Sequence, residues 1–170
     1  MDVAIRAELP ADRQSVYTVN AAAFPTYNEA KLVEGLHAAG LPLLSLVAVI
    51  GAEVVGHILF SPVFVVNGEV KTPAIGLGPL AVHPAHQRLG IGSQLTREGL
   101  KQCAGLGHQI IFVLGHPDYY SRFGFRLAAP HGLHYKDASF DPYFMFLELL
   151  PGTARGVRGE VVYHELFDGG

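Results

Sequence analysis

A strand, a loop, a helix and a second strand follow one another in the middle of the chain, and this unit constrains the fold more than any other feature. Apolar runs over residues 75–82 and 110–114 predict two buried strands, and residues 91–104 between them predict a helix. A helical crossover joins strands that lie parallel in one sheet, with a right-handed connection. We therefore predict an α/β fold with a parallel pair of strands at its centre.

The segments on either side of this unit predict further strands and helices. Asn28 and Gly40 are suited to begin and end a helix over residues 28–39, and Asn67-Gly68 is typical of a hairpin turn. The other predicted elements are helices over residues 10–23 and 117–123 and strands over residues 3–7, 43–50, 54–66, 144–149 and 160–163. The expected architecture is a single domain over residues 1–170, with a twisted mixed sheet of about seven strands, one central parallel pair and helices on both faces.

Composition excludes several classes of partner. With 12 Lys and Arg against 15 Asp and Glu, the net charge of −3 disfavours binding to the backbone of a nucleic acid. Cys103 is the only cysteine, so neither an internal disulfide nor a cysteine metal cluster can form. The longest apolar run, residues 41–50, is too short to span a bilayer, and the first residues do not resemble a signal peptide. We expect a cytoplasmic protein without a membrane partner.

The segment Gln87-Arg88-Leu89-Gly90-Ile91-Gly92-Ser93 carries the strongest chemical signal. It lies between a predicted buried strand and the first turn of a predicted helix, where backbone N–H groups are unpaired and the helix dipole is positive. Gly90 and Gly92 would let a phosphate approach the backbone, and Arg88 and Ser93 could add donors. A tight turn without a ligand is the alternative interpretation of the two glycines.

Two better-known phosphate motifs do not fit the sequence. The chain lacks the Gly-x-x-x-x-Gly-Lys pattern of a P-loop. Residues 76–81 match the glycine pattern of dinucleotide-binding folds, but Pro84 would stop the helix that must begin there. These glycines instead indicate a strand that something else approaches closely.

A second segment, residues 116–125, follows the other strand of the parallel pair. The carboxyl ends of neighbouring parallel strands can separate and leave a crevice, and Tyr119 and Tyr120 are placed to lie near it. Packing is the alternative explanation for each tyrosine taken alone.

Together, the two segments resemble the GNAT family of N-acetyltransferases. Residues 87–92 match its acetyl-CoA motif of Gln or Arg, two residues, Gly, one residue, and Gly or Ala. Residues 120–125 match its Tyr-x-x-x-Gly-Phe motif, and the Gly-Pro-Leu-Ala-Val stretch with the paired tyrosines is similar to the YhbS-like branch. The match covers about fifty residues, between positions 76 and 125. Val113 stands where many members carry Asn, so one side-chain contact to pantetheine is not expected.

The resemblance implies an enzyme that uses acetyl-CoA as co-substrate and transfers its acetyl group directly to an amine. Tyr120 would be the general acid that protonates the leaving thiolate. The residues implied in binding acetyl-CoA are Leu80, Ala81, Val82, Gln87, Arg88, Leu89, Gly90, Ile91, Gly92, Ser93 and Tyr120. The acceptor would be a small-molecule amine, a peptide N-terminus or a lysine.

Other assignments stay open at this point. The candidates for the general base are Glu29, His57, His83 and His116. Cys103 is expected to be a buried structural thiol, and the paired histidines lack a third ligand that would indicate a metal. A CoA-binding module without turnover is the main alternative, and a nucleotide-binding protein is a weaker one. The strand over residues 144–149 could pair across a homodimer.

Overall fold

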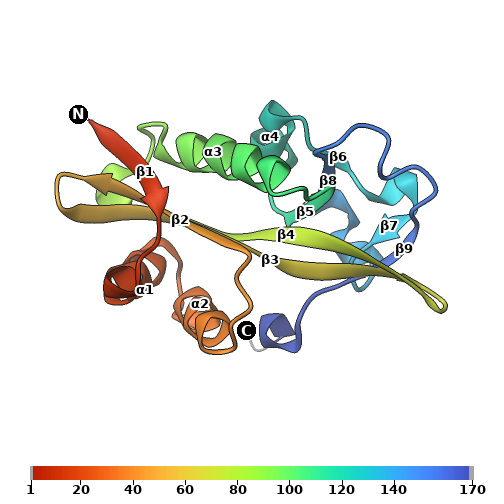
Figure 1. Cartoon of the computed structure of the whole chain (residues 1–170), viewed down its shortest axis with the longest axis horizontal. Coiled ribbons are helices and arrows are strands. Elements are labelled where there is room, and N and C mark those ends of the chain that lie inside the picture. The colour runs from red at the N-terminus through yellow and green to blue at the C-terminus, as the bar shows by residue number, and fades with distance from the viewer. Residues whose placement is uncertain (1, 169–170) are drawn as a thin grey trace. The chain divides into compact units, whose positions relative to one another are not determined.

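The computed structural model describes residues 2–168, which divide into two compact units. Unit 1 consists of residues 2–61, 78–102 and 165–168, and unit 2 of residues 62–77 and 103–164. Strands β3 (Glu53–Asn67) and β4 (Val70–Val82) each contribute to both units. The two units contain nine strands, two more than the sequence predicts (Figure 1). That they act as a single domain stays a prediction.

The sheet of unit 1 is antiparallel. Strand β1 (Val3–Ala7) pairs with β2 (Leu44–Ile50) from Val3 opposite Ile50 to Ala7 opposite Leu46. Strand β2 pairs in turn with the first part of β3, and a bulge interrupts the register between Ala48 and Val49. Unit 1 therefore contains the last residues of β1, the first residues of β2 and the last residues of β4. The polar residues described below lie at or next to these strand ends.

Helices cover both faces of this sheet, as the sequence predicts (Figure 1). On one face, α1 (Arg13–Ala23) and α2 (Asn28–Ala38) pack on β2 and β3 through a core of Val16, Val19, Val33, Leu36, Val47, Val49 and Leu59. On the other face lies α3 (Ile91–Gly105), whose Gly99 lies so close to Phe60 that an added Cβ would stand 2.5 Å from the ring. Gly99 thus allows this helix to lie close to the sheet.

Unit 2 contains the predicted parallel pair. The first half of β4 runs parallel to β5 (Ile110–Leu114), with Gly76 opposite Phe112. Strand β8 (Phe144–Glu148) is antiparallel to β5, β6 (Arg126–Leu127) is antiparallel to β8, and β9 (Gly159–Val162) is antiparallel to the second half of β3. A second, short parallel pair joins β7 (Leu133–His134) to β9, which the sequence does not predict. Helix α4 (Pro117–Tyr120) follows β5.

Three local expectations need correction. Tyr27 rather than Asn28 is the N-cap of α2, and the hydroxyl of Thr26 accepts a hydrogen bond from the Asn28 amide instead. Strands β6 and β7 have two residues each, too few for a periodic pattern to predict. Strand β8 is bonded to β5 on one side and to β6 on the other at Met145 and Phe146, so these residues cannot pair across a dimer. A homodimer formed in another way stays a prediction.

No helix within residues 2–168 combines the length and the apolar character that crossing a membrane requires.

Candidate active site

The glycine-rich loop lies between β4 and α3, as its sequence predicts. After β4, a turn of 3-10 helix (Pro84–His86) leads into the loop, where Arg88 and Gly90 both have positive φ, at 64° and 82°. Helix α3 begins at Ile91, and the carbonyl of Gly90 accepts from the Gln94 amide at 3.0 Å. Ile91 is buried and anchors the helix start, whereas Arg88, Leu89 and Gly90 are exposed.

The backbone amides of this loop have no partner among the described residues. Among residues 2–168, no hydrogen-bond acceptor pairs with the amides of Arg88, Leu89, Gly90, Ile91, Gly92 or Ser93. The side chain of Gln87 braces the loop, because its amide nitrogen donates to the carbonyl of Val82 at 2.9 Å. A run of unpaired N–H groups at the start of a fifteen-residue helix is suited to bind an anion.

Leu80, Ala81 and Val82 lie at the end of β4 in the same unit. Ala81 is buried in the core beneath α1 and α2, and Leu80 and Val82 are half-buried. The glycine pattern over residues 76–81 therefore belongs to a strand and not to a helix start. Its Gly76 is approached by the ring of Tyr163, which would stand 2.8 Å from an added Cβ.

Tyr120 is the last residue of α4 in unit 2 and is only 9% exposed. Its ring lies across the backbone of Gly115, where an added Cβ would come within 2.4 Å, and makes edge contacts with Tyr119 and Phe125. Burial, and to a smaller extent Tyr119, raises the pKa of Tyr120 above its usual value. The hydroxyl therefore keeps its proton at neutral pH, and among residues 2–168 it has no hydrogen-bond partner.

The four candidates for the general base differ in their burial and in their hydrogen bonds. Nδ1 of His83 accepts from the Ala85 amide at 3.1 Å, so its neutral ring carries the proton on Nε2 and has no free lone pair. His116 is exposed and packs edge-on against Tyr143. Glu29, in the first turn of α2, has a buried carboxylate oxygen, Oε1, without a hydrogen-bond partner among the described residues. His57 is completely buried.

Cys103 is a structural residue. Its side chain is fully buried, and burial raises the pKa of its thiol to about 12. A thiol in such an environment is neither a nucleophile nor a metal ligand at neutral pH.

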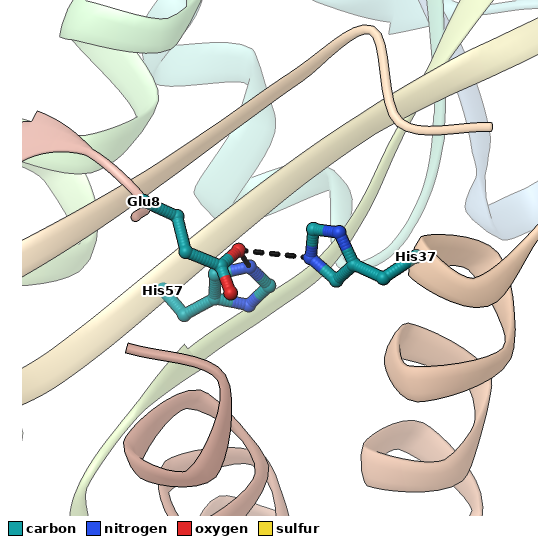
Figure 2. Close-up of side chains that lie close together, drawn as sticks. All are labelled: Glu8, His37 and His57. Carbon is teal, nitrogen blue, oxygen red and sulfur yellow. Dashed lines mark hydrogen bonds and ion pairs between the residues drawn. The ribbon is translucent and has the colours of Figure 1, made fainter. Parts of the chain in front are cut away.

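His57 belongs to a buried polar cluster around Glu8 (Figure 2). Glu8 follows β1, and its Oε1 accepts from Ser45 on β2 and from His37 Nε2 in the last turn of α2, the latter at 2.9 Å. The guanidinium of Arg13 lies 2.7 Å from Glu8 Oε2. The two groups form an ion pair, but their orientation does not meet the geometry of a hydrogen bond. Burial alone would raise the pKa of Glu8, but the contacts with His57, Ser45 and Arg13 outweigh it and lower the pKa to about 2.

The cluster assigns the proton positions of His57. The side-chain nitrogen of Asn20 donates to the carbonyl of Val16 at 3.0 Å and to His57 Nδ1 at 3.1 Å. Since Nδ1 accepts, the neutral ring carries its proton on Nε2, which lies 2.8 Å from Ser45 Oγ. Burial also lowers the pKa of His57, so the ring stays neutral. Three hydrogen bonds thus follow one another: Asn20 donates to His57, His57 donates to Ser45, and Ser45 donates to the Glu8 carboxylate.

This chemistry does not fit a metal ion, although Glu8, His37 and His57 lie close enough to share one. A histidine that binds a metal through Nε2 donates its Nδ1–H to an acceptor. Here the partner of His57 Nδ1 is itself a donor, Asn20. The cluster instead ties together β1, β2, β3, α1 and α2 of unit 1.

Sequence reasoning missed most of this cluster. Of its members only His57 was a candidate, and for a different role, because Glu8, Asn20, His37 and Ser45 are far apart in the chain. The one available signal is a charged residue directly after a strand, which is too common to be informative.

Comparison with known proteins shows the family to which the chain belongs. The model of the acetyltransferase (GNAT) domain matches residues 4–128, so the chain belongs to the GNAT family of acetyltransferases. It is 36% identical over 165 residues to the uncharacterized N-acetyltransferase YhbS of Escherichia coli K12, covering 96% of this chain and 98% of that protein. The predicted family, branch and fold class are thereby confirmed.

Two solved structures are similar over nearly the whole chain. The crystal structure of E. coli YhbS in complex with CoA superposes with a TM-score of 0.93 at 36% identity, covering 98% of this chain and 92% of that one. A GNAT family acetyltransferase from Brucella melitensis in complex with acetyl-CoA superposes with a TM-score of 0.81 at 37% identity, covering 98% and 99%.

Proposed function

We propose that this chain transfers the acetyl group of acetyl-CoA directly to an amine bound in the same complex. The observation that carries the proposal is the run of unpaired backbone amides from Arg88 to Ser93. Several N–H groups in a row at a helix start suit the two phosphates of a diphosphate, and CoA contains one. The CoA and acetyl-CoA complexes of two similar proteins support the same ligand for this chain.

In this proposal the backbone of Leu80, Ala81 and Val82 binds the pantetheine arm, and the amides of residues 88–93 bind the diphosphate. The acceptor nitrogen attacks the carbonyl carbon, the new C–N bond forms, and the C–S bond breaks. Tyr120 stabilises the sulfur that leaves. Because the pKa of Tyr120 is raised while that of a thiol is ~8.5, a hydrogen bond to the thiolate is favoured over complete proton transfer.

The acceptor in this proposal is a primary amine on a small molecule, a peptide N-terminus or a lysine. It must lose a proton to react, and Glu29 is the best-suited base among the candidates. Its Oε1 is buried and lacks a hydrogen-bond partner among the described residues, whereas the acceptor nitrogen of His83 is already occupied. An unpaired buried carboxylate oxygen is unfavourable unless a donor such as an amine binds to it.

The test compares the wild type with Tyr120→Phe. Thiol release from acetyl-CoA is followed with a panel of amines, amino acids and peptides, and calorimetry measures CoA affinity. We expect kcat to fall by roughly 10² while the affinity for CoA stays the same, since the lost hydroxyl acts on the leaving sulfur.

Tyr119→Phe is the matched control, because it removes the neighbouring hydroxyl and should leave kcat unchanged. An unchanged kcat in Tyr120→Phe would remove the role of that residue. CoA binding without thiol release for any amine would favour a binding module, and the absence of CoA binding would overturn the whole proposal.

A further inference from the structure

A hollow with a volume of about 770 Å³ lies in unit 2. Its lining includes four basic side chains, Arg126, His131, Arg155 and Arg158, and a single acidic one, Glu148. In a chain with a net charge of −3, this is a local concentration of positive charge. A concave site lined by one sign of charge concentrates the field and attracts ligands of the opposite sign.

The one carboxylate in the hollow does not neutralise it. Oε1 of Glu148 lies 3.2 Å from the Arg126 guanidinium, and Oε2 accepts from the Ala154 amide at 2.9 Å. Within residues 2–168, no carboxylate forms an ion pair with Arg155 or Arg158. Both guanidinium groups therefore have their donors available to a ligand.

Packing holds three of the four basic side chains in place. The guanidinium of Arg126 lies over the ring of Phe146, 4.9 Å from its centroid, and the His131 ring meets the same phenylalanine edge-on at 4.9 Å. The stem of Arg158 lies against Gly132, where it would be 3.4 Å from an added Cβ. Because β7 pairs with β9 beside these two residues, Arg158 is fixed relative to the floor of the hollow.

The hollow is separate from Tyr120 within unit 2. Glu148 is paired with Ile110 at the start of β5, whereas α4 and Tyr120 follow the end of β5. Tyr120, the residue proposed to act on the leaving sulfur, is not among the residues that line the hollow.

We propose that this hollow binds a small molecule with two or more anionic groups, phosphate or carboxylate. Arginine presents a rigid fork of donors that matches both groups, and charge-assisted hydrogen bonds of this kind are the stronger ones. The volume is within the range of small-ligand sites, and the concave shape suits a compact polyanion rather than a flat macromolecular surface.

The experiment is calorimetric titration of the full chain with inorganic pyrophosphate and, separately, with citrate. Each titration is done in the presence of saturating CoA, so that a phosphate site at the glycine-rich loop is occupied. If the chain does not bind CoA, the comparison of variants below still tests the hollow. Pyrophosphate and citrate distinguish a phosphate ligand from a carboxylate one.

The decisive variant is Arg155→Ala/Arg158→Ala, and the matched control is Lys71→Ala/Lys101→Ala. Both remove two positive charges from exposed positions, but neither lysine lines the hollow. We expect saturable binding of at least one probe to the wild type, weakened at least about tenfold in the arginine variant and unchanged in the lysine variant. Thermal melting checks that both variants fold. No saturable binding to the wild type, or equal affinity in the arginine variant, would overturn the proposal.

Discussion

The cluster around Glu8 and the loop from Gln87 to Ser93 are both polar, and both belong to unit 1, but their hydrogen bonding is opposite. In the cluster, Asn20, His57 and Ser45 form a chain of donors that ends on the carboxylate. In the loop, six consecutive amides have no acceptor within residues 2–168.

The difference separates a structural role from a binding role. Buried polar groups must find partners during folding, and the hydrogen bonds of this cluster link elements of unit 1, although Glu8 Oε2 and Asn20 Oδ1 have no hydrogen-bond partner among the described residues. Unpaired amides at a helix start can bind water until a ligand replaces it, so they can remain without a protein partner in the folded chain at little cost. The presence of a polar residue therefore does not by itself indicate function. What separates the two roles is whether the hydrogen-bonding groups are paired within the protein.

Replacing Glu8 should have the largest effect. In Glu8→Ala the charge of Arg13 loses its partner, and Ser45 and His37 lose their acceptor. We expect the free energy of unfolding to fall by about 3 kcal/mol or more, measured by urea denaturation at pH 7. Glu69→Ala, an exposed acidic residue in the hairpin turn, is the control and should change stability little.

If Glu8→Ala and Glu69→Ala were equally stable, the cluster would not be the link between the elements of unit 1 that we describe. Since no hydrogen bond within residues 2–168 joins the glycine-rich loop to Glu8, residual folded Glu8→Ala protein should bind CoA with unchanged affinity.

A substitution in the loop should weaken binding rather than folding. In Gly90→Val, a β-branched side chain enters a backbone position with φ of 82° and stands beside the unpaired amides. We expect CoA affinity to fall roughly 10- to 100-fold by calorimetry. Gly107→Val is a matched control, because Gly107 has a φ of 89° and open space around it but lies outside the loop. Equal losses of affinity in both variants would point to general strain instead of a phosphate site.

Mild acid should produce the smallest effect. The pKa of Glu8 is lowered from 4.5 to about 2, so its contribution to stability is complete above pH 4.5 and is lost as the pH falls toward 2. Between pH 7 and pH 4 we expect the stability difference between the wild type and Glu8→Ala to shrink by about 1 kcal/mol, measured by denaturation at each pH. A difference that stays constant down to pH 2 would mean that the cluster does not lower the pKa of Glu8.

Much of the fold could be predicted because its signals are local. Apolar periodicity located β2, β3, β5 and all three long helices, and Gly68 forms the predicted hairpin turn with a φ of 62°. The two-residue strands β6 and β7 were missed, since they exist only through their partners β8 and β9. The N-cap of α2 was misassigned because Asn28 and its neighbours offer several capping residues, and the loop geometry selects among them.

For the site, the sequence determined the chemistry that can be read over a few consecutive residues: a glycine-rich turn into a helix, and a tyrosine after a strand. Tertiary structure decided what depends on distant residues, such as the tautomer of His57, the free oxygen of Glu29 and the three arginines that line the hollow of unit 2. The physical reason is that backbone conformation follows from neighbouring residues, whereas burial, charge pairing and proton position depend on groups that only folding brings together.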